Sequence, residues 1–153
     1  MTEPRLTNTA ELFPELNGFA AALSKALDNG SVPRTTIGLV QMRAGQLAGS
    51  TYLTVRHAGA LREAGEPEER ITAVSSWQDA PYFTAAERAA LALVEAVLTP
   101  NPHGERVPDE LFDAAAEHYD ATALSTLTMA IGQVCFFVPY ALIIKPPPAP
   151  VAS

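Results

Sequence analysis

Apolar residues recur at the three- and four-residue spacing of an α-helix along almost the whole chain, and no segment shows the alternation typical of a β-strand. Glycine, proline and short polar runs divide this pattern into segments. The pattern predicts helices over residues 9–27, 33–48, 51–63, 67–77 and 84–98, a short helix from Pro108 and a long last helix from Asp120. We therefore expect an all-α fold, a compact bundle of about six to seven helices.

Local signals mark several helix ends. Asn29-Gly30 is a typical C-terminal stop, and Thr84 followed by Glu87 forms the pattern of a capping box. Asp120 is a good N-cap for the last helix, and Pro139 is expected to bend that helix. These signals set the boundaries more firmly than hydrophobic spacing alone.

The length of the chain suits one domain. Its 153 residues can build one hydrophobic core and are too few for two ordinary ones. We expect a single all-α domain over residues 1–145, followed by a proline-rich, extended and mobile tail over residues 146–153. Residues 127–144 carry no charge and reach the length of a membrane span, but they include Gly132, Gln133 and Pro139. A buried central helix is the preferred interpretation, with no membrane partner.

Composition excludes several functions. The net charge of −7 disfavours binding to nucleic acid. The single cysteine, Cys135, excludes a disulfide or a multi-thiolate metal site within one chain, and the three histidines lack metal-ligand spacing. The N-terminus lacks the basic start and apolar run of a signal peptide, so we expect a cytoplasmic protein with no metal and no cofactor.

The segment 43–57, which reads RAGQLAGSTYLTVRH, resembles the core motif of the alkylhydroperoxidase D / carboxymuconolactone decarboxylase superfamily. Its peroxidase-like members usually show Arg-Ala-Ser-Gln-x-x-Gly-Cys-x-x-Cys-x-x-x-His there. The resemblance continues through residues 64–66, 77–84 and 87–91 and covers roughly residues 12–147. It implies an oligomeric all-α protein, assembled as a dimer, trimer or hexamer, with a small-molecule site beside the motif.

The redox residues that the resemblance implies are missing. The two cysteine positions hold Ser50 and Leu53, and the upstream glutamate position holds Gly38, so that His57 alone matches. Serine cannot pass through the sulfenic acid and disulfide states of a thiol peroxidase. The sequence therefore predicts a degenerate member of the superfamily without thiol peroxidase activity.

The remaining motif residues suggest a candidate site. Leu53 and His57 lie four residues apart on one helix face, with Ser50 at its start, where an N-cap is the simpler interpretation. The candidate catalytic residues are His57, whose ordinary pKa near 6.5 suits proton transfer, and Tyr52. The candidate substrate-binding residues are Ser50, Leu53, Trp77, Gln133, Phe137 and Tyr140.

Two functions remain open at this point. In the first, the protein is a cofactor-independent enzyme that catalyses decarboxylation, isomerisation, lactone opening or cyclisation of a small, largely apolar molecule, with His57 moving the proton. In the second, it is a non-catalytic ligand-binding or structural homo-oligomer whose inherited pocket has lost its chemistry. The apolar segment 135–140 fits either a reshaped pocket or a closed core.

Overall fold

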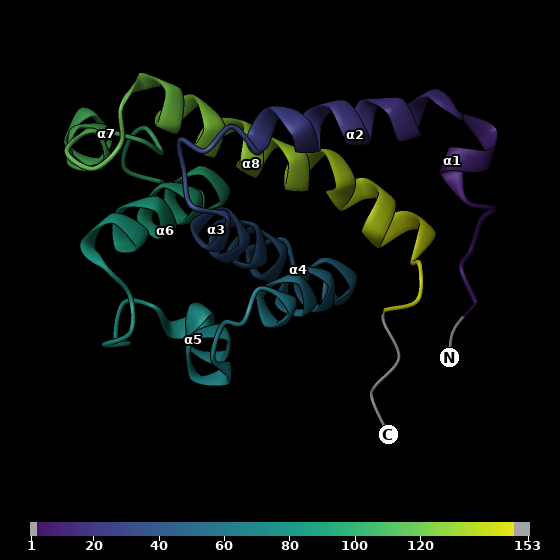
Figure 1. The fold of residues 1–153 in the computed structure, drawn as a ribbon, viewed down its shortest axis with the longest axis horizontal. Coiled ribbons are helices and arrows are strands. Elements are labelled where there is room, and N and C mark those ends of the chain that lie inside the picture. The colour runs from purple at the N-terminus through teal and green to yellow at the C-terminus, as the bar shows by residue number, and fades with distance from the viewer. Residues whose placement is uncertain (1–2, 149–153) are drawn as a thin grey trace.

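The computed structural model describes residues 3–148, which form eight α-helices and no β-strand (Figure 1). The helices are α1 (Thr9–Leu12), α2 (Glu15–Leu27), α3 (Arg34–Leu47), α4 (Thr51–Glu63), α5 (Glu68–Ala73), α6 (Ala85–Leu98), α7 (Asp109–Ala116) and α8 (Ala121–Pro139). A 3-10 turn, η1 (Val74–Ser76), follows α5, and a π-helical turn, η2 (Tyr140–Ile144), follows α8. The predicted all-α class is confirmed.

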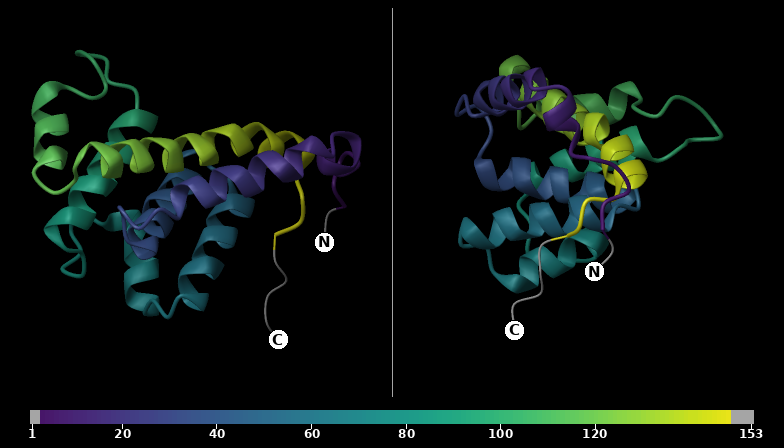
Figure 2. Two further views of the ribbon diagram at one scale, coloured as in Figure 1. Left: turned by 45° about the horizontal axis from the view of Figure 1, so that its top comes forward. Right: turned by 90° about the vertical axis from the view of Figure 1, so that its right-hand side faces the viewer.

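Helix α3 lies at the centre of the fold and contacts α4, α6 and α8. Helices α2 and α8 lie side by side across one face, which Figures 1 and 2 show from different directions. One apolar core fills the space between α3, α6 and α8, and a second joins α3 to α4, α5 and η1. Because α2 rests mainly on α8, the first two helices form an arm beside the main bundle (Figure 2).

The prediction of one continuous helix over residues 9–27 is wrong. Helix α1 ends at Leu12, Phe13 adopts a non-helical backbone with φ −131°, and α2 begins after Pro14. A proline disfavours the helical conformation in the residue before it, which is the reason for the break. The break separates the short α1 from α2 and raises the number of helices above that expected.

The capping signals are confirmed. Thr84 and Glu87 form a reciprocal capping box at α6, and the Asp120 carboxylate accepts a hydrogen bond from the Ala123 amide at 2.8 Å. Ser50 caps α4, because its hydroxyl oxygen accepts from the Leu53 amide at 3.2 Å. Gly49 precedes it with φ +69°, a conformation that glycine adopts without a steric cost.

Helix α8 and the turn after it are long and apolar enough to cross a membrane by length and composition. In this fold the α8 side chains that contact α3 and α6 are buried, among them Leu127, Ala130 and Val134. One face of α8 therefore lies in the core, and about a third of the most apolar part of this segment is buried.

Pro139 changes the helix at its C-terminal end. Proline has no N–H and its ring crowds the preceding turn, and the chain continues as the π-helical turn η2. The Ile144 carbonyl then accepts a hydrogen bond from the Arg5 amide at 2.8 Å, which ties the two ends of the described chain together. Residues 146–148 have no regular secondary structure, and the rest of the predicted tail, 149–153, lies outside the described residues.

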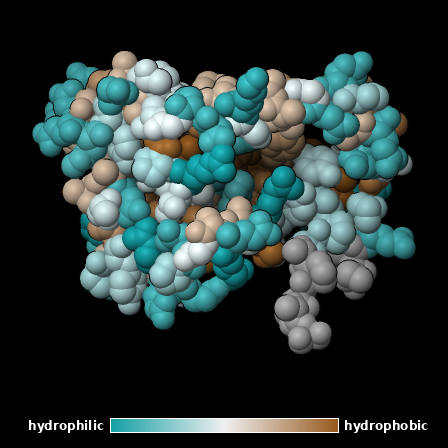
Figure 3. Space-filling view, viewed as in Figure 1, coloured by the Kyte–Doolittle hydropathy of each residue, from teal (hydrophilic) through white to brown (hydrophobic). Residues whose placement is uncertain are grey.

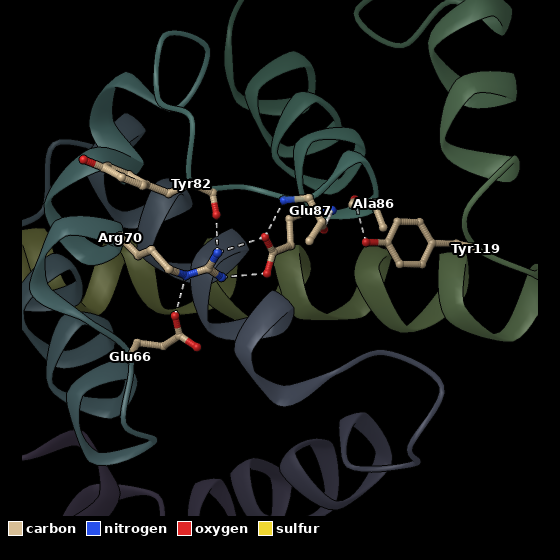
Figure 4. A network of polar contacts seen from close by, with 7 residues as sticks. Glu66, Arg70, Tyr82, Ala86, Glu87 and Tyr119 are labelled. Carbon is tan, nitrogen blue, oxygen red and sulfur yellow. Dashed lines mark hydrogen bonds and ion pairs between the residues drawn. The ribbon is translucent and has the colours of Figure 1, made fainter.

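A polar network joins α5 to the start of α6 (Figure 4). Arg70 forms ion pairs with Glu66 and Glu87, each at 2.7 Å, and donates a hydrogen bond to the Tyr82 carbonyl. The Tyr119 hydroxyl donates to the Ala86 carbonyl at 2.6 Å, and burial raises the pKa of this phenol to about 12. These contacts hold α5 and the segment after α7 against the start of α6. None of these residues lines the cavity that is described in the next subsection.

Candidate functional site

A cavity of about 700 Å³ lies between the N-terminal arm, α4 and the end of α8. Figure 3 shows hydrophobic residues between hydrophilic ones near the middle of the face that carries α2, α8 and α4. Most of the surface of the wall is apolar, and its polar groups come from Asn8, Thr9, Asn17, Ser24, Gln41, Tyr52, Arg56, His57, Gln133 and Tyr140. This combination is typical of sites that bind small organic molecules.

Six of the eight predicted site residues line this cavity: Tyr52, Leu53, His57, Gln133, Phe137 and Tyr140. The first three come from α4, where Leu53 and His57 share a face because they lie four residues apart and Tyr52 lies beside them. The other three come from α8 and η2, and the π-helical turn carries Tyr140. The structure therefore brings together residues that are about 80 positions apart in the chain.

Ser50 and Trp77 do not line the cavity. The Ser50 hydroxyl is used in the cap of α4, and its side chain is buried in the turn between α3 and α4. The Trp77 indole lies in the second core, and its N–H donates to the Glu95 carboxylate at 3.2 Å, beside Arg43. Both side chains have structural partners.

His57 is partly buried and forms no hydrogen bond with any residue that the structure describes. Burial, with a smaller contribution from the neighbouring Arg56 cation, lowers the pKa of His57 from 6.5 to about 4. The expectation of an ordinary histidine pKa is therefore wrong. The ring is neutral at pH 7, so one of its nitrogens is free to accept a proton.

Two phenols lie near one another on the cavity wall. The rings of Tyr52 and Tyr140 meet edge to face with centroids 6.2 Å apart, and Phe137 packs against Tyr140 at 6.4 Å. Burial and the nearby Tyr52 raise the pKa of Tyr140, against a smaller opposing effect of Arg56. Partial burial places the Tyr140 hydroxyl in a setting where a hydrogen bond to a ligand is strengthened.

A pair of glutamines lines the cavity beside α3. The Gln41 amide donates to the Gln133 side-chain oxygen at 2.7 Å and to the Ala130 carbonyl at 3.3 Å. A smaller cavity of about 310 Å³ shares Ser24, Gln41 and Gln133 with the first. The two glutamines therefore line both cavities.

Sequence reasoning missed three parts of the wall: Gln41, Arg56 and the arm, which contributes residues such as Leu16 and Ala20. Arg56 lies inside the recognised motif, four residues after Tyr52, and that spacing on one helix face was an available signal. The arm carries no motif, and only the packing of α2 on α8 places it there.

The structure also shows what occupies the redox positions of the motif. Leu53 is buried in the core, and a Cβ atom at position 38 would lie 2.8 Å from the Leu61 side chain, which fills the space. Cys135 is partly buried in α8, and burial raises the pKa of its thiol. Residues 3–148 contain no cluster of three or more histidine, cysteine or acidic side chains that could hold a metal ion.

Comparisons with known proteins find a matching family model and two relatives in sequence. The model of the carboxymuconolactone decarboxylase family matches residues 11–96, more than half of the chain. The uncharacterised protein YdfG of Bacillus subtilis is 33% identical over 125 residues, which cover 81% of this chain and 83% of YdfG. The uncharacterised protein YnjA of Escherichia coli is 32% identical over 94 residues, or 61% of this chain and half of YnjA.

Solved structures share the fold. ATU0492 of Agrobacterium tumefaciens, a protein of unknown function described as a candidate AhpD antioxidant defence protein, aligns with a TM-score of 0.85 and 27% identity over 98% of this chain and all of its own. The debrominase Bmp8, solved with 2,3,4-tribromopyrrole, aligns with a TM-score of 0.79 and 22% identity over 91% of this chain and 73% of its own. At that identity the second likeness shows the fold alone.

Proposed function

Since the chain belongs to the carboxymuconolactone decarboxylase family, we propose that it is a cofactor-independent enzyme that transfers a proton within a small, largely apolar molecule. One observation carries the proposal: neutral His57 and the phenols of Tyr52 and Tyr140 line one apolar cavity of about 700 Å³. Decarboxylation, isomerisation, lactone opening and cyclisation are reactions of this class. The family and the all-α fold support a small-molecule enzyme, and the cavity supports the choice of residues.

In this mechanism His57 accepts a proton from a C–H group next to a carbonyl of the substrate. The electron pair left behind moves onto a carbonyl oxygen, where the Tyr52 or Tyr140 hydroxyl donates a hydrogen bond to the developing enolate. His57 then returns the proton to another atom of the molecule. The low pKa of His57 makes the free ring a weak base, but the enolate formed beside it stabilises the imidazolium by opposite charge.

The experiment begins with native mass spectrometry of the protein purified from its own host, which reports any retained small molecule. Proton NMR of that compound in deuterated buffer then measures its exchange or conversion by the enzyme. We expect His57→Ala to reduce the rate by about 100-fold or more, the usual contribution of a general base. His103→Ala, in an exposed loop, is the matched control and should retain the full rate. Unchanged turnover by His57→Ala would overturn the assignment.

A second function is favoured by the altered motif. Ser50 serves as a helix cap, Leu53 is core and Leu61 occupies the space beside Gly38, so three positions of the redox relay have structural uses. A non-catalytic ligand-binding or structural protein would keep this fold and cavity. A retained compound that binds in the cavity and never exchanges or converts with the wild-type protein would favour this alternative.

We also predict that the protein does not reduce hydroperoxides. Its one thiol, Cys135, lies in α8, and burial raises its pKa, which reduces the thiolate needed to attack a peroxide. In an assay with cumene hydroperoxide and dithiothreitol, the wild type and Cys135→Ser should both consume the peroxide at the rate of the same mixture without protein. Peroxide turnover that Cys135→Ser abolishes would contradict this.

A further inference from the structure

The charge on the cavity wall is of one sign. Among the side chains that line the cavity, Arg56 is the one that carries a full charge at pH 7, since His57 is neutral and the described wall contains no aspartate, glutamate or lysine. The chain as a whole has a net charge of −7. The wall of this cavity therefore carries a single positive charge in a protein whose net charge is negative.

Arg56 also differs from other arginines in its partners. Arg34, Arg43, Arg62 and Arg70 each pair with a carboxylate. Arg88 and Arg106 donate to backbone carbonyls at 2.9–3.2 Å, and Arg5, like Arg56, has no ion pair within the described part of the chain, but it lies outside the cavity wall. Arg56 pairs with no carboxylate among residues 3–148, and its one polar contact is a long hydrogen bond of 3.4 Å to the Tyr52 hydroxyl. Because Arg56 is exposed and also lines the cavity, its guanidinium lies where the cavity meets solvent and can contact a ligand.

The neighbouring polar groups match this charge. The Tyr52 and Tyr140 hydroxyls can both donate hydrogen bonds, and with the Arg56 guanidinium they form a set of donors around an apolar space. A guanidinium binds a carboxylate, sulfonate or phenolate oxygen by charge-assisted hydrogen bonds. A cationic ligand would meet repulsion from Arg56 and find no carboxylate on the described wall, although the aromatic rings alone would tolerate it.

We propose that this cavity selects monoanions with an apolar, preferably aromatic, body, and that Arg56 binds their negative group at the cavity mouth. The proposal deepens the proposed function, since it rests on this cavity being the substrate site and assigns the substrate a charge. The anion sits beside Arg56 and Tyr52, and the apolar body lies against Leu53, Phe137 and Val134. His57, one residue from Arg56 on α4, then faces the part of the molecule next to its charged group.

A matched pair of fluorescent probes tests this selectivity. 8-Anilinonaphthalene-1-sulfonate and N-phenyl-1-naphthylamine have the same aromatic body, and only the first carries an anionic sulfonate. We expect the wild type to bind the sulfonate about tenfold more tightly or better, the size of effect typical of a charged hydrogen bond. Raising the salt concentration should weaken the binding of the sulfonate and leave that of the neutral probe unchanged.

Three variants locate the effect. Arg56→Gln should abolish the preference for the sulfonate without changing the affinity for the neutral probe, and Arg56→Lys should retain part of it. Arg62→Gln is the control, because it removes the same charge from the same helix at a residue outside the cavity wall. Equal affinities of the wild type for the two probes, or equal losses in Arg56→Gln and Arg62→Gln, would overturn the proposal.

The same titrations separate this proposal from the proposed function. His57→Ala, which should reduce turnover by about 100-fold or more, should keep the preference for the sulfonate, since His57 is neutral. A protein that binds the sulfonate through Arg56 but catalyses no proton transfer would keep the anion site and lose the enzyme assignment. A protein that converts its compound without any preference for the sulfonate would keep the enzyme assignment and lose the anion site.

Discussion

The neutral state of His57 gives the folded protein a defined sensitivity to acid. Burial lowers its pKa to about 4 in the folded chain, whereas in the unfolded chain the side chain returns to its ordinary value of 6.5. Between pH 6.5 and pH 4 the unfolded state binds a proton on this side chain that the folded state does not. The free energy of unfolding is therefore highest, as far as His57 determines it, above pH 6.5, and it decreases as the pH falls toward 4. This decrease in the free energy of unfolding is about 2 kcal/mol after allowance for the partial exposure of the ring.

We therefore predict that the free energy of unfolding falls more steeply between pH 7 and pH 4.5 in the wild type than in His57→Gln, which has no proton to gain there. Urea unfolding of both proteins at several pH values measures the difference. Carboxylates such as Glu95 titrate in both proteins and cancel in the comparison. Parallel curves for the two proteins would show that His57 is not buried in its neutral form.

Helices α3 and α4 approach each other closely where Gly45 faces Leu53. A Cβ atom at position 45 would lie 3.1 Å from the Leu53 Cβ and 3.1 Å from the Thr54 amide nitrogen. The second contact is to backbone, which a change of side-chain rotamer cannot relieve. The small residue at position 45 thus sets the distance between α3 and the helix that carries Tyr52, Leu53 and His57.

Gly45→Ala should therefore reduce the free energy of unfolding by about 1–3 kcal/mol, the usual cost of overpacking. Gly59→Ala is the matched control on α4, because nothing lies within 4 Å of its added methyl group. That substitution should instead stabilise the protein by about 0.5–1 kcal/mol, since alanine favours a helix more than glycine does. Urea denaturation midpoints for the two variants measure both effects, and a stabilised Gly45→Ala would contradict the tight crossing.

Helix ends were predictable wherever a residue carries its own signal. Thr84, Asp120 and Ser50 cap their helices through hydrogen bonds to nearby amides, so local sequence is sufficient. The break at Pro14 was missed because apolar spacing continues across it. In the site, the motif predicted the contribution of α4, and the distant α8 followed from its aromatic residues. Gln41 and the arm depend on how helices pack, and no local pattern encodes that.

At the scale of the whole molecule, exposed apolar side chains are concentrated at one end. Of the ten large hydrophobic residues exposed among residues 3–148, seven lie on the N-terminal arm, the end of α8 or η2: Leu6, Leu12, Phe13, Phe19, Phe136, Leu142 and Ile143. Phe83 adds nothing to the exposed apolar surface, because it is buried beneath Arg70. Clustered apolar surface of this kind is typical of protein interfaces.

We predict that the protein self-associates through this end. The wild type should sediment as a dimer or larger species at micromolar concentration, because pairing two copies there removes the exposed side chains from water. Phe13→Asp places a charge in that surface and should shift the protein toward the monomer. Phe112→Asp, at a similarly exposed phenylalanine on α7 at the opposite end in Figure 1, should leave the assembly intact. A monomeric wild type, or dissociation by Phe112→Asp alone, would contradict this interface.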